Sequence, residues 1–166
     1  MKNLILSITA LFITLSVSSQ TIVDAAASNK DFSTLVTALK AADLVGALSG
    51  EGPYTVFAPN NDAFGKIDSE TLGSLLKPEN VGALSNILTY HVVSGKLMAS
   101  DVTKALKDGY GRVKLTALNG QTFVARSKGG KIFLKDQNGD MSEVIATDVV
   151  GTNGVIHVID SVIMPE

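Results

Sequence analysis

The first half of the chain carries apolar residues with the period of an α-helix. They recur at i, i+3, i+4 and i+7 over residues 32–39 and again over residues 84–91, which predicts two amphipathic helices, each with one buried face. Asp31 and Asn80 are placed where a side-chain oxygen can cap these helices. Shorter helices are expected at residues 21–28, 44–48, 61–64, 69–76 and 100–107.

The second half changes to the period-two pattern of β-strands. Predicted strands cover residues 113–118, 122–126, 131–135, 143–149 and 155–164, and an earlier short strand covers 54–58. Four dipeptides between the later strands are typical of hairpin turns with positive φ: Asn119-Gly120, Gly129-Gly130, Asn138-Gly139 and Asn153-Gly154. Helices first and hairpins later predict an α+β fold rather than a βαβ alternation.

Residues 1–20 have the layout of a secretory signal peptide. The cation Lys2 precedes an unbroken apolar and hydroxyl stretch over residues 4–17, and small polar residues follow. The stretch is shorter than the roughly 20 residues that cross a bilayer, so cleavage within residues 18–20 is favoured over an uncleaved anchor. Residues 21–166 are then expected to form a single exported domain, periplasmic or extracellular, without a membrane span.

Cysteine content and charge argue against disulfide stabilisation and against binding of nucleic acid. The chain has no cysteine, so its core must be stable without disulfides. Its formal net charge is −2, and removal of Lys2 with the leader makes the charge more negative. The two arginines, Arg112 and Arg126, and the scattered lysines show no basic cluster in the sequence, which argues against nucleic acid as a partner.

No residue pattern indicates catalysis, a metal or another cofactor. The chain has two histidines, His91 and His157, and contains no G-x-S-x-G motif; His157 lies within an apolar run, where a hydrogen-bonded structural role is expected. The run Asp136-Gln137-Asn138-Gly139-Asp140 superficially resembles a calcium loop, but its glycine is fourth rather than sixth. We therefore expect a hairpin turn there and a protein that is not an enzyme.

Three segments of the chain resemble the fasciclin domain family. Residues 54–64, 88–95 and 152–160, here called the fasciclin segments, are similar in order and spacing to the family's first homology box, tyrosine-histidine motif and second homology box. The residues that carry the resemblance and are expected to have structural roles are Thr55, Phe57, Ala58, Pro59, Asn61, Ala63, Phe64, Asn153, Gly154, His157 and Asp160. The resemblance implies a wedge-shaped β-sandwich with several helices packed along one side.

The resemblance also implies a non-enzymatic adhesion or matrix-binding module that recognises a cell-surface protein or polysaccharide. In some members of this family the tyrosine-histidine region has been linked to receptor binding, which makes Tyr90 and His91 the candidates for partner contact. The position of His91 on the apolar stripe favours core packing instead. The alternative function is a carrier of a small apolar ligand, a carotenoid or lipid, in a cleft between helices and sandwich. The oligomeric state stays open.

Overall fold

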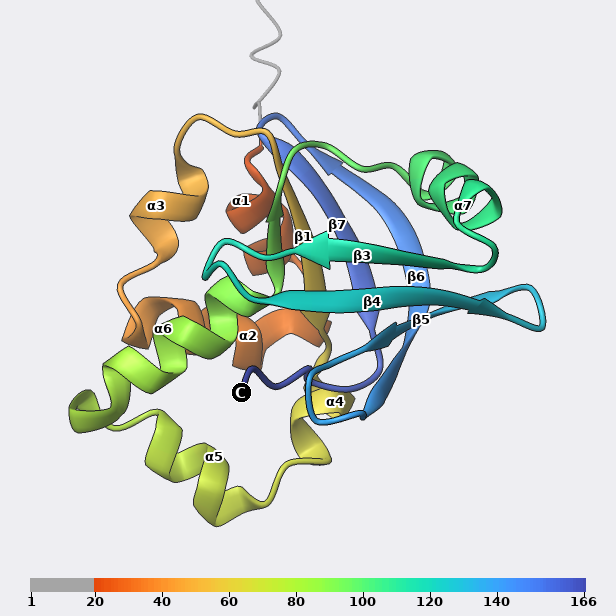
Figure 1. Cartoon of the computed structure of the whole chain (residues 1–166). Helices are drawn as coiled ribbons and strands as arrows, with labels where there is room; N and C mark the ends of the chain where they lie inside the picture. The colour runs from red at the N-terminus through yellow and green to blue at the C-terminus, as the bar shows by residue number, and fades with distance from the viewer. Residues whose placement is uncertain (1–19) are drawn as a thin grey trace, which may run out of the picture.

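The structure, a computed structural model, describes residues 20–166 and groups helices around one strongly curved sheet (Figure 1). The helical elements are α1 Ile22–Ser28, η1 Lys30–Phe32, α2 Ser33–Ala41, α3 Val45–Ser49, α4 Asn61–Gly65, α5 Ser69–Leu75, η2 Pro78–Asn80, α6 Val81–Tyr90 and α7 Ala99–Asp108. The strands are β1 Tyr54–Pro59, β2 Val92–Ser94, β3 Arg112–Thr116, β4 Thr122–Lys128, β5 Lys131–Lys135, β6 Met141–Gly151 and β7 Gly154–Ile159. The predicted signal peptide lies almost wholly outside the described residues, and none of the helices in residues 20–166 has the length and apolar character needed to cross a membrane.

All seven strands belong to one mixed sheet in the order β2-β1-β7-β6-β5-β4-β3, in which only the β1–β7 pair is parallel. A bridge between Val93 and Ala117 joins β2 to the chain just after β3, so the sheet almost closes on itself. The sandwich that the resemblance implied is not confirmed. The physical reason lies in β6, which has eleven residues and two register shifts and pairs with both β7 and β5, so that the two halves stay continuous.

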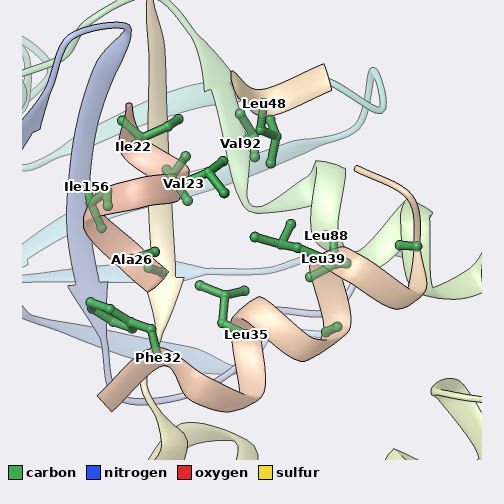
Figure 2. Close-up of a cluster of buried hydrophobic side chains, with 14 of the residues drawn as sticks. Ile22, Val23, Ala26, Phe32, Leu35, Leu39, Leu48, Leu88, Val92 and Ile156 are labelled. Atoms are coloured by element: carbon green, nitrogen blue, oxygen red, sulfur yellow. The ribbon is translucent and has the colours of Figure 1, made fainter. Parts of the chain in front are cut away.

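Two apolar cores lie on opposite sides of β1 and β7. The first lies between the helices and the sheet and includes Ile22 and Val23 of α1, Leu35 of α2 and Ile156 of β7 (Figure 2). The second fills the inside of the curved sheet and centres on Phe57, Tyr90, Phe123, Leu134 and Ile159. Because β1 and β7 are covered on both faces, their sequences are almost continuously apolar rather than alternating.

Two predicted helix caps are wrong in detail. Asp31 lies inside η1, and the side chain that caps this turn is Asn29, which accepts a hydrogen bond from the Asp31 N–H. Asn80 does precede α6, but its side-chain amide donates to the Ser74 carbonyl oxygen instead of capping the helix. In both places a short 3₁₀ turn precedes the α-helix and changes which side chain reaches the free N–H groups.

The predicted positive φ is found at three of the four turn dipeptides. Gly120, both Gly129 and Gly130, and Gly139 have positive φ, as tight hairpins require. At the fourth, the hairpin is present, with Thr152 and Asn153 between the paired Gly151 and Gly154, but its predicted positive φ is wrong, because neither Asn153 nor Gly154 has it. Glycine is needed at 154 for close approach: a Cβ there would overlap the Tyr54 carbonyl oxygen on the neighbouring strand.

Candidate functional site around Tyr90 and His91

Tyr90 ends α6 and is completely buried in the inner core. Its hydroxyl donates a hydrogen bond of 3.0 Å to the Thr122 carbonyl oxygen, and its ring packs edge-on against Phe123 with centroids 5.5 Å apart. Burial raises the pKa of Tyr90 to about 12, and the charge of Asp136 adds to this effect. The phenol is therefore a neutral structural donor that joins α6 to β4.

His91 follows directly and is 2% exposed. Its Nδ1 lies 2.8 Å from the Ile87 carbonyl oxygen, which can only accept, so Nδ1 carries the proton. Nε2 then accepts a hydrogen bond of 3.1 Å from the Ile163 N–H. Burial lowers the pKa of His91 to about 4, and neither the Ile87 bond nor the charge of Asp136 offsets this effect.

Both candidate contact residues thus lie in the core. In this conformation neither ring reaches solvent, so a partner would meet the surface that Tyr90 and His91 support rather than the rings themselves. Their measurable effect here is to connect α6 with β4 and with the C-terminal segment at Ile163.

The β1 part of the first fasciclin segment connects the sheet to its neighbours. The Thr55 hydroxyl donates to the Gly95 carbonyl oxygen at 2.6 Å and accepts from the Leu97 N–H at 2.9 Å, which fixes the chain after β2. Phe57 packs edge-on against Phe123 inside the sheet, whereas Ala58 faces the helices. Pro59 is the last residue of the strand, as expected, since proline cannot donate a further ladder hydrogen bond.

The remainder of that segment organises α4 and α2. Asn60 caps α4 by accepting from the Ala63 N–H at 2.8 Å, and the methyl group of Ala63 and the ring of Phe64 are buried. Asn61 has a different partner: its Oδ1 accepts from the Thr34 N–H at 3.1 Å. Asn61 therefore supplies, from a distant segment, the cap that Asp31 was expected to provide for α2.

Asn153, between β6 and β7, joins three elements. Its amide donates to the carbonyl oxygens of Leu48 and Gly50 at 2.8 and 2.9 Å, and its Oδ1 accepts from the Ile22 N–H at 2.9 Å. Its backbone oxygen also accepts from the Tyr54 N–H. One side chain thus fixes the start of α1 and the end of α3 against the sheet.

His157 and Asp160 complete the third fasciclin segment. The Nε2–H of His157 donates to the Leu97 carbonyl oxygen at 2.7 Å, and the ring is 1% exposed. Burial acts to raise the pKa of Asp160, but hydrogen bonds from the Glu143 N–H, Lys66 and Ser161 outweigh it and hold the pKa below its usual range. Both residues are therefore engaged in connections within the domain.

The buried polar side chains around these residues make their hydrogen bonds within the domain. Every fully buried side-chain nitrogen or oxygen in the described part of the chain has a hydrogen-bond partner. Across residues 20–166 no three His, Asp or Glu side chains come together as a metal site would require. The run 136–140 forms the β5–β6 turn, in which the Asp136 carboxylate accepts from the N–H groups of Asp140 and Met164.

An apolar pocket lies between α1, α2 and the sheet, beside His91. It is lined by side chains such as Val23, Leu39, Leu88 and Ile156, and its volume is about 20 Å³ (Figure 2). A single water molecule needs about 10–15 Å³ of such space, and ligand pockets measure roughly 300–1,000 Å³. As folded here, the pocket is too small for a carotenoid or lipid.

Sequence reasoning missed a concentration of cations on the outer surface of β3, β4 and β5, here called the basic face. Strand pairing places on it Arg112, Lys114, Arg126, Lys128, Lys131 and Lys135. The signal was present as i, i+2 spacing of the cations in β3 and β4 and as i, i+4 spacing in β5. The strand register that aligns the cations cannot be read from the sequence.

Comparison with known proteins defines the class. The family model of the fasciclin domain matches residues 30–165, and the chain belongs to this family. Protein sll1483 of Synechocystis sp. is 49% identical over 148 residues, which cover 89% of this chain and 75% of that protein. The immunogenic protein MPB70 of Mycobacterium bovis is 34% identical, with 85% and 67% covered. Human periostin is 36% identical over 82% of this chain, which corresponds to 15% of periostin.

A solved structure agrees in fold. The FAS1 domain pair of the insect cell adhesion molecule Fasciclin I superposes with a TM-score of 0.59 at 22% sequence identity, covering 78% of this chain and 43% of that one. The resemblance found in the three fasciclin segments is thereby confirmed, and the domain has the FAS1 fold.

Proposed function

We propose that this protein is a non-enzymatic adhesion or matrix-binding module, exported to the periplasm or the cell exterior, that recognises a cell-surface protein or polysaccharide. The observation that carries the proposal is that polar side chains of the fasciclin segments form hydrogen bonds inside the domain. The polar side chains of Thr55, Asn153, His157 and Asp160 all bond within the domain, so recognition falls to the exterior.

Family membership and the sequence support the same function. The solved neighbour is described as an insect cell adhesion molecule, and the expected signal peptide at residues 1–20 is consistent with export. Tyr90 and His91 enter this proposal as residues that shape the partner surface, because they hold α6 against β4 and against the C-terminal segment.

A direct adhesion assay tests the proposal. The purified protein is displayed on beads, either sparsely or as an artificial multimer, and its retention on intact cells and on extracted matrix is measured. A domain with one binding surface gains avidity on multivalent display, by about a hundredfold or more. Equal retention of the multimer and of beads without protein would remove the support for adhesion.

The second candidate is a carrier of a small apolar ligand, and the observation in its favour is the apolar lining of the pocket beside His91. For a carotenoid or lipid to enter, α1 and α2 must move away from the sheet, since the present volume is about 20 Å³. Organic extraction of protein purified from its native host decides between the two: a stoichiometric pigment or lipid favours the carrier, and an empty extract counts against it.

A further inference from the structure

The basic face contrasts with the charge of the whole molecule. The chain has a formal net charge of −2, yet three adjacent strands direct six of its 14 lysines and arginines to one side of the sheet. The inward positions of the same strands, such as Phe123, Ala125 and Leu134, are buried. In Figure 1, β3 and β4 cross in front of β1, β7 and β6, with α7 above them.

The arrangement of the two arginines is unfavourable for the free domain. Arg112 and Arg126 are direct cross-strand partners, and like charges directly opposite each other destabilise a sheet. Among the described residues neither arginine has an ion-pair partner, whereas Lys131 on the same face pairs with Glu143 at 2.7 Å. The described part of the domain thus supplies no carboxylate to this pair, and a bound anion would supply one.

Tyr110, which lines a groove with the two arginines, has an unfavourable backbone conformation. Tyr110 is 98% exposed and has φ of 53°, a left-handed conformation that usually requires glycine. It ends α7 in a Schellman turn, in which the Gly111 N–H bonds to the Leu106 carbonyl oxygen at 2.7 Å. The Gly111 carbonyl oxygen in turn accepts from the Ser127 N–H at 2.9 Å, so the turn is fixed to β4.

Tyr110, Arg112, Arg126 and Lys128 line the same open groove, which has a volume of about 450 Å³. Arginine binds carboxylates through two parallel N–H donors, and an exposed tyrosine offers a flat apolar face on which a sugar ring can lie. A polymer that repeats a sugar ring and a carboxylate provides both features at once.

We propose that the basic face, with Tyr110 at its edge, binds an acidic polysaccharide. The inference rests on the adhesion function proposed above and names its surface and ligand class. A single-stranded nucleic acid requires several stacking rings along the strands, but within residues 20–166 Tyr110 is the one strongly exposed aromatic side chain.

Binding to immobilised polygalacturonate tests the proposal, with dextran, single-stranded DNA and vesicles containing anionic lipid as comparison probes. The protein is expected to bind polygalacturonate and not dextran. The double variant R112Q/R126Q is expected to bind at least about tenfold more weakly, because it loses charge-assisted hydrogen bonds. The matched control K40Q/K77Q removes two exposed cations elsewhere and is expected to bind like the parent.

The variant Y110G separates binding from folding. Glycine relieves the left-handed backbone, so the midpoint of thermal unfolding should rise, while affinity for polygalacturonate falls about threefold to tenfold through loss of ring stacking. Absence of polygalacturonate binding, or equal binding by parent and R112Q/R126Q, overturns the proposal. Tighter binding to DNA or to anionic vesicles overturns it in favour of that ligand.

The same variants distinguish this inference from the broader function. If R112Q/R126Q adheres to cells and matrix as the parent does, adhesion stands and the basic face is the wrong surface. If the parent adheres to neither cells nor polygalacturonate, both proposals fail.

Discussion

The β1–β7 pair and the β3–β4–β5 face differ in where their polar side chains go. Along β1 and β7, Thr55 and His157 are buried and bond to backbone groups of the same domain. On the basic face, Arg112 and Arg126 are exposed and oppose each other. The first region contains the residues by which the family is recognised in the sequence, whereas the second contains no family segment.

The difference shows that the recognisable segments and the binding surface need not coincide. Residues that join several elements, such as Asn153, can be replaced only at a cost to folding, so they mark the fold. Charged side chains on the outer surface of a sheet can change with little effect on the core. Variants in the two regions should therefore separate stability from binding.

The largest expected effect is that of Gly154→Ala. The added Cβ would overlap the Tyr54 carbonyl oxygen and push β1 and β7 apart, so we expect the free energy of unfolding to fall by about 4 kcal/mol. Chemical denaturation measures it. Gly46→Ala, where the new Cβ meets no other side chain and no other segment within 4 Å, should leave stability unchanged or raise it by up to about 1 kcal/mol. A loss of less than about 1 kcal/mol for Gly154→Ala would show that β1 and β7 can move apart without destabilising the domain.

Asn153→Ala should follow in size. It removes two donated bonds and one accepted bond that fix α3 and α1, at an expected cost of about 3 kcal/mol. Asn138→Ala in the exposed β5–β6 turn is the control and should change stability by less than about 0.5 kcal/mol. If both variants unfold at the same denaturant concentration, Asn153 does not have the joining role described here.

The stability of the domain should depend on pH through His91. Its folded pKa of about 4 lies below the ordinary histidine pKa of 6.5, so the unfolded chain binds more protons and stability falls as pH drops below 6.5. Between pH 7 and pH 5 we expect a loss of about 2 kcal/mol. The loss should continue down to about pH 4.

The control for this pH dependence is His91→Gln. Glutamine does not titrate, so this variant should be less stable at pH 7 but lose little further stability by pH 5. Asp160, whose pKa is lowered, affects stability only at lower pH, outside this window. Unchanged stability of the parent protein between pH 7 and pH 5 would contradict the neutral, buried imidazole.

Local patterns in the sequence predicted most elements but not the contacts between them. The periodicity of residues 84–91 located α6, and the Gly129-Gly130 dipeptide located the β4–β5 hairpin, because both depend on neighbouring residues. The cap on α2 comes from Asn61, 27 residues beyond Thr34, and no local pattern reveals it. The three-residue strand β2 is too short to show a period.

The basic face was missed for the same reason. Its cations are spread over residues 112–135 and look scattered in the sequence, since only the register of three strands aligns Arg112 with Arg126 and Lys128 with Lys131. Similarly, the two register shifts that bend β6 and make one continuous sheet instead of a sandwich depend on tertiary packing.

The smallest effect expected, and the one with opposite sign, is that of Arg126→Glu. Glutamate replaces repulsion by attraction across the strands to Arg112, so the free energy of unfolding should rise by about 0.5 kcal/mol at low salt. Screening should abolish the gain in 1 M salt. Lys77→Glu, at an exposed position outside the strands, is the control and should show no such gain.

A rise in stability at Arg126 would show that the domain keeps an arginine pair that its own folding does not favour. Suppose that the Gly154 and Asn153 variants also lose stability. Residues of the β1–β7 pair would then be retained because folding requires them, and residues of the basic face because binding requires them. If Arg126→Glu instead destabilises the protein in denaturation experiments, the guanidinium supports the sheet itself. The β1–β7 pair and the basic face would then differ only in how deeply their side chains are buried.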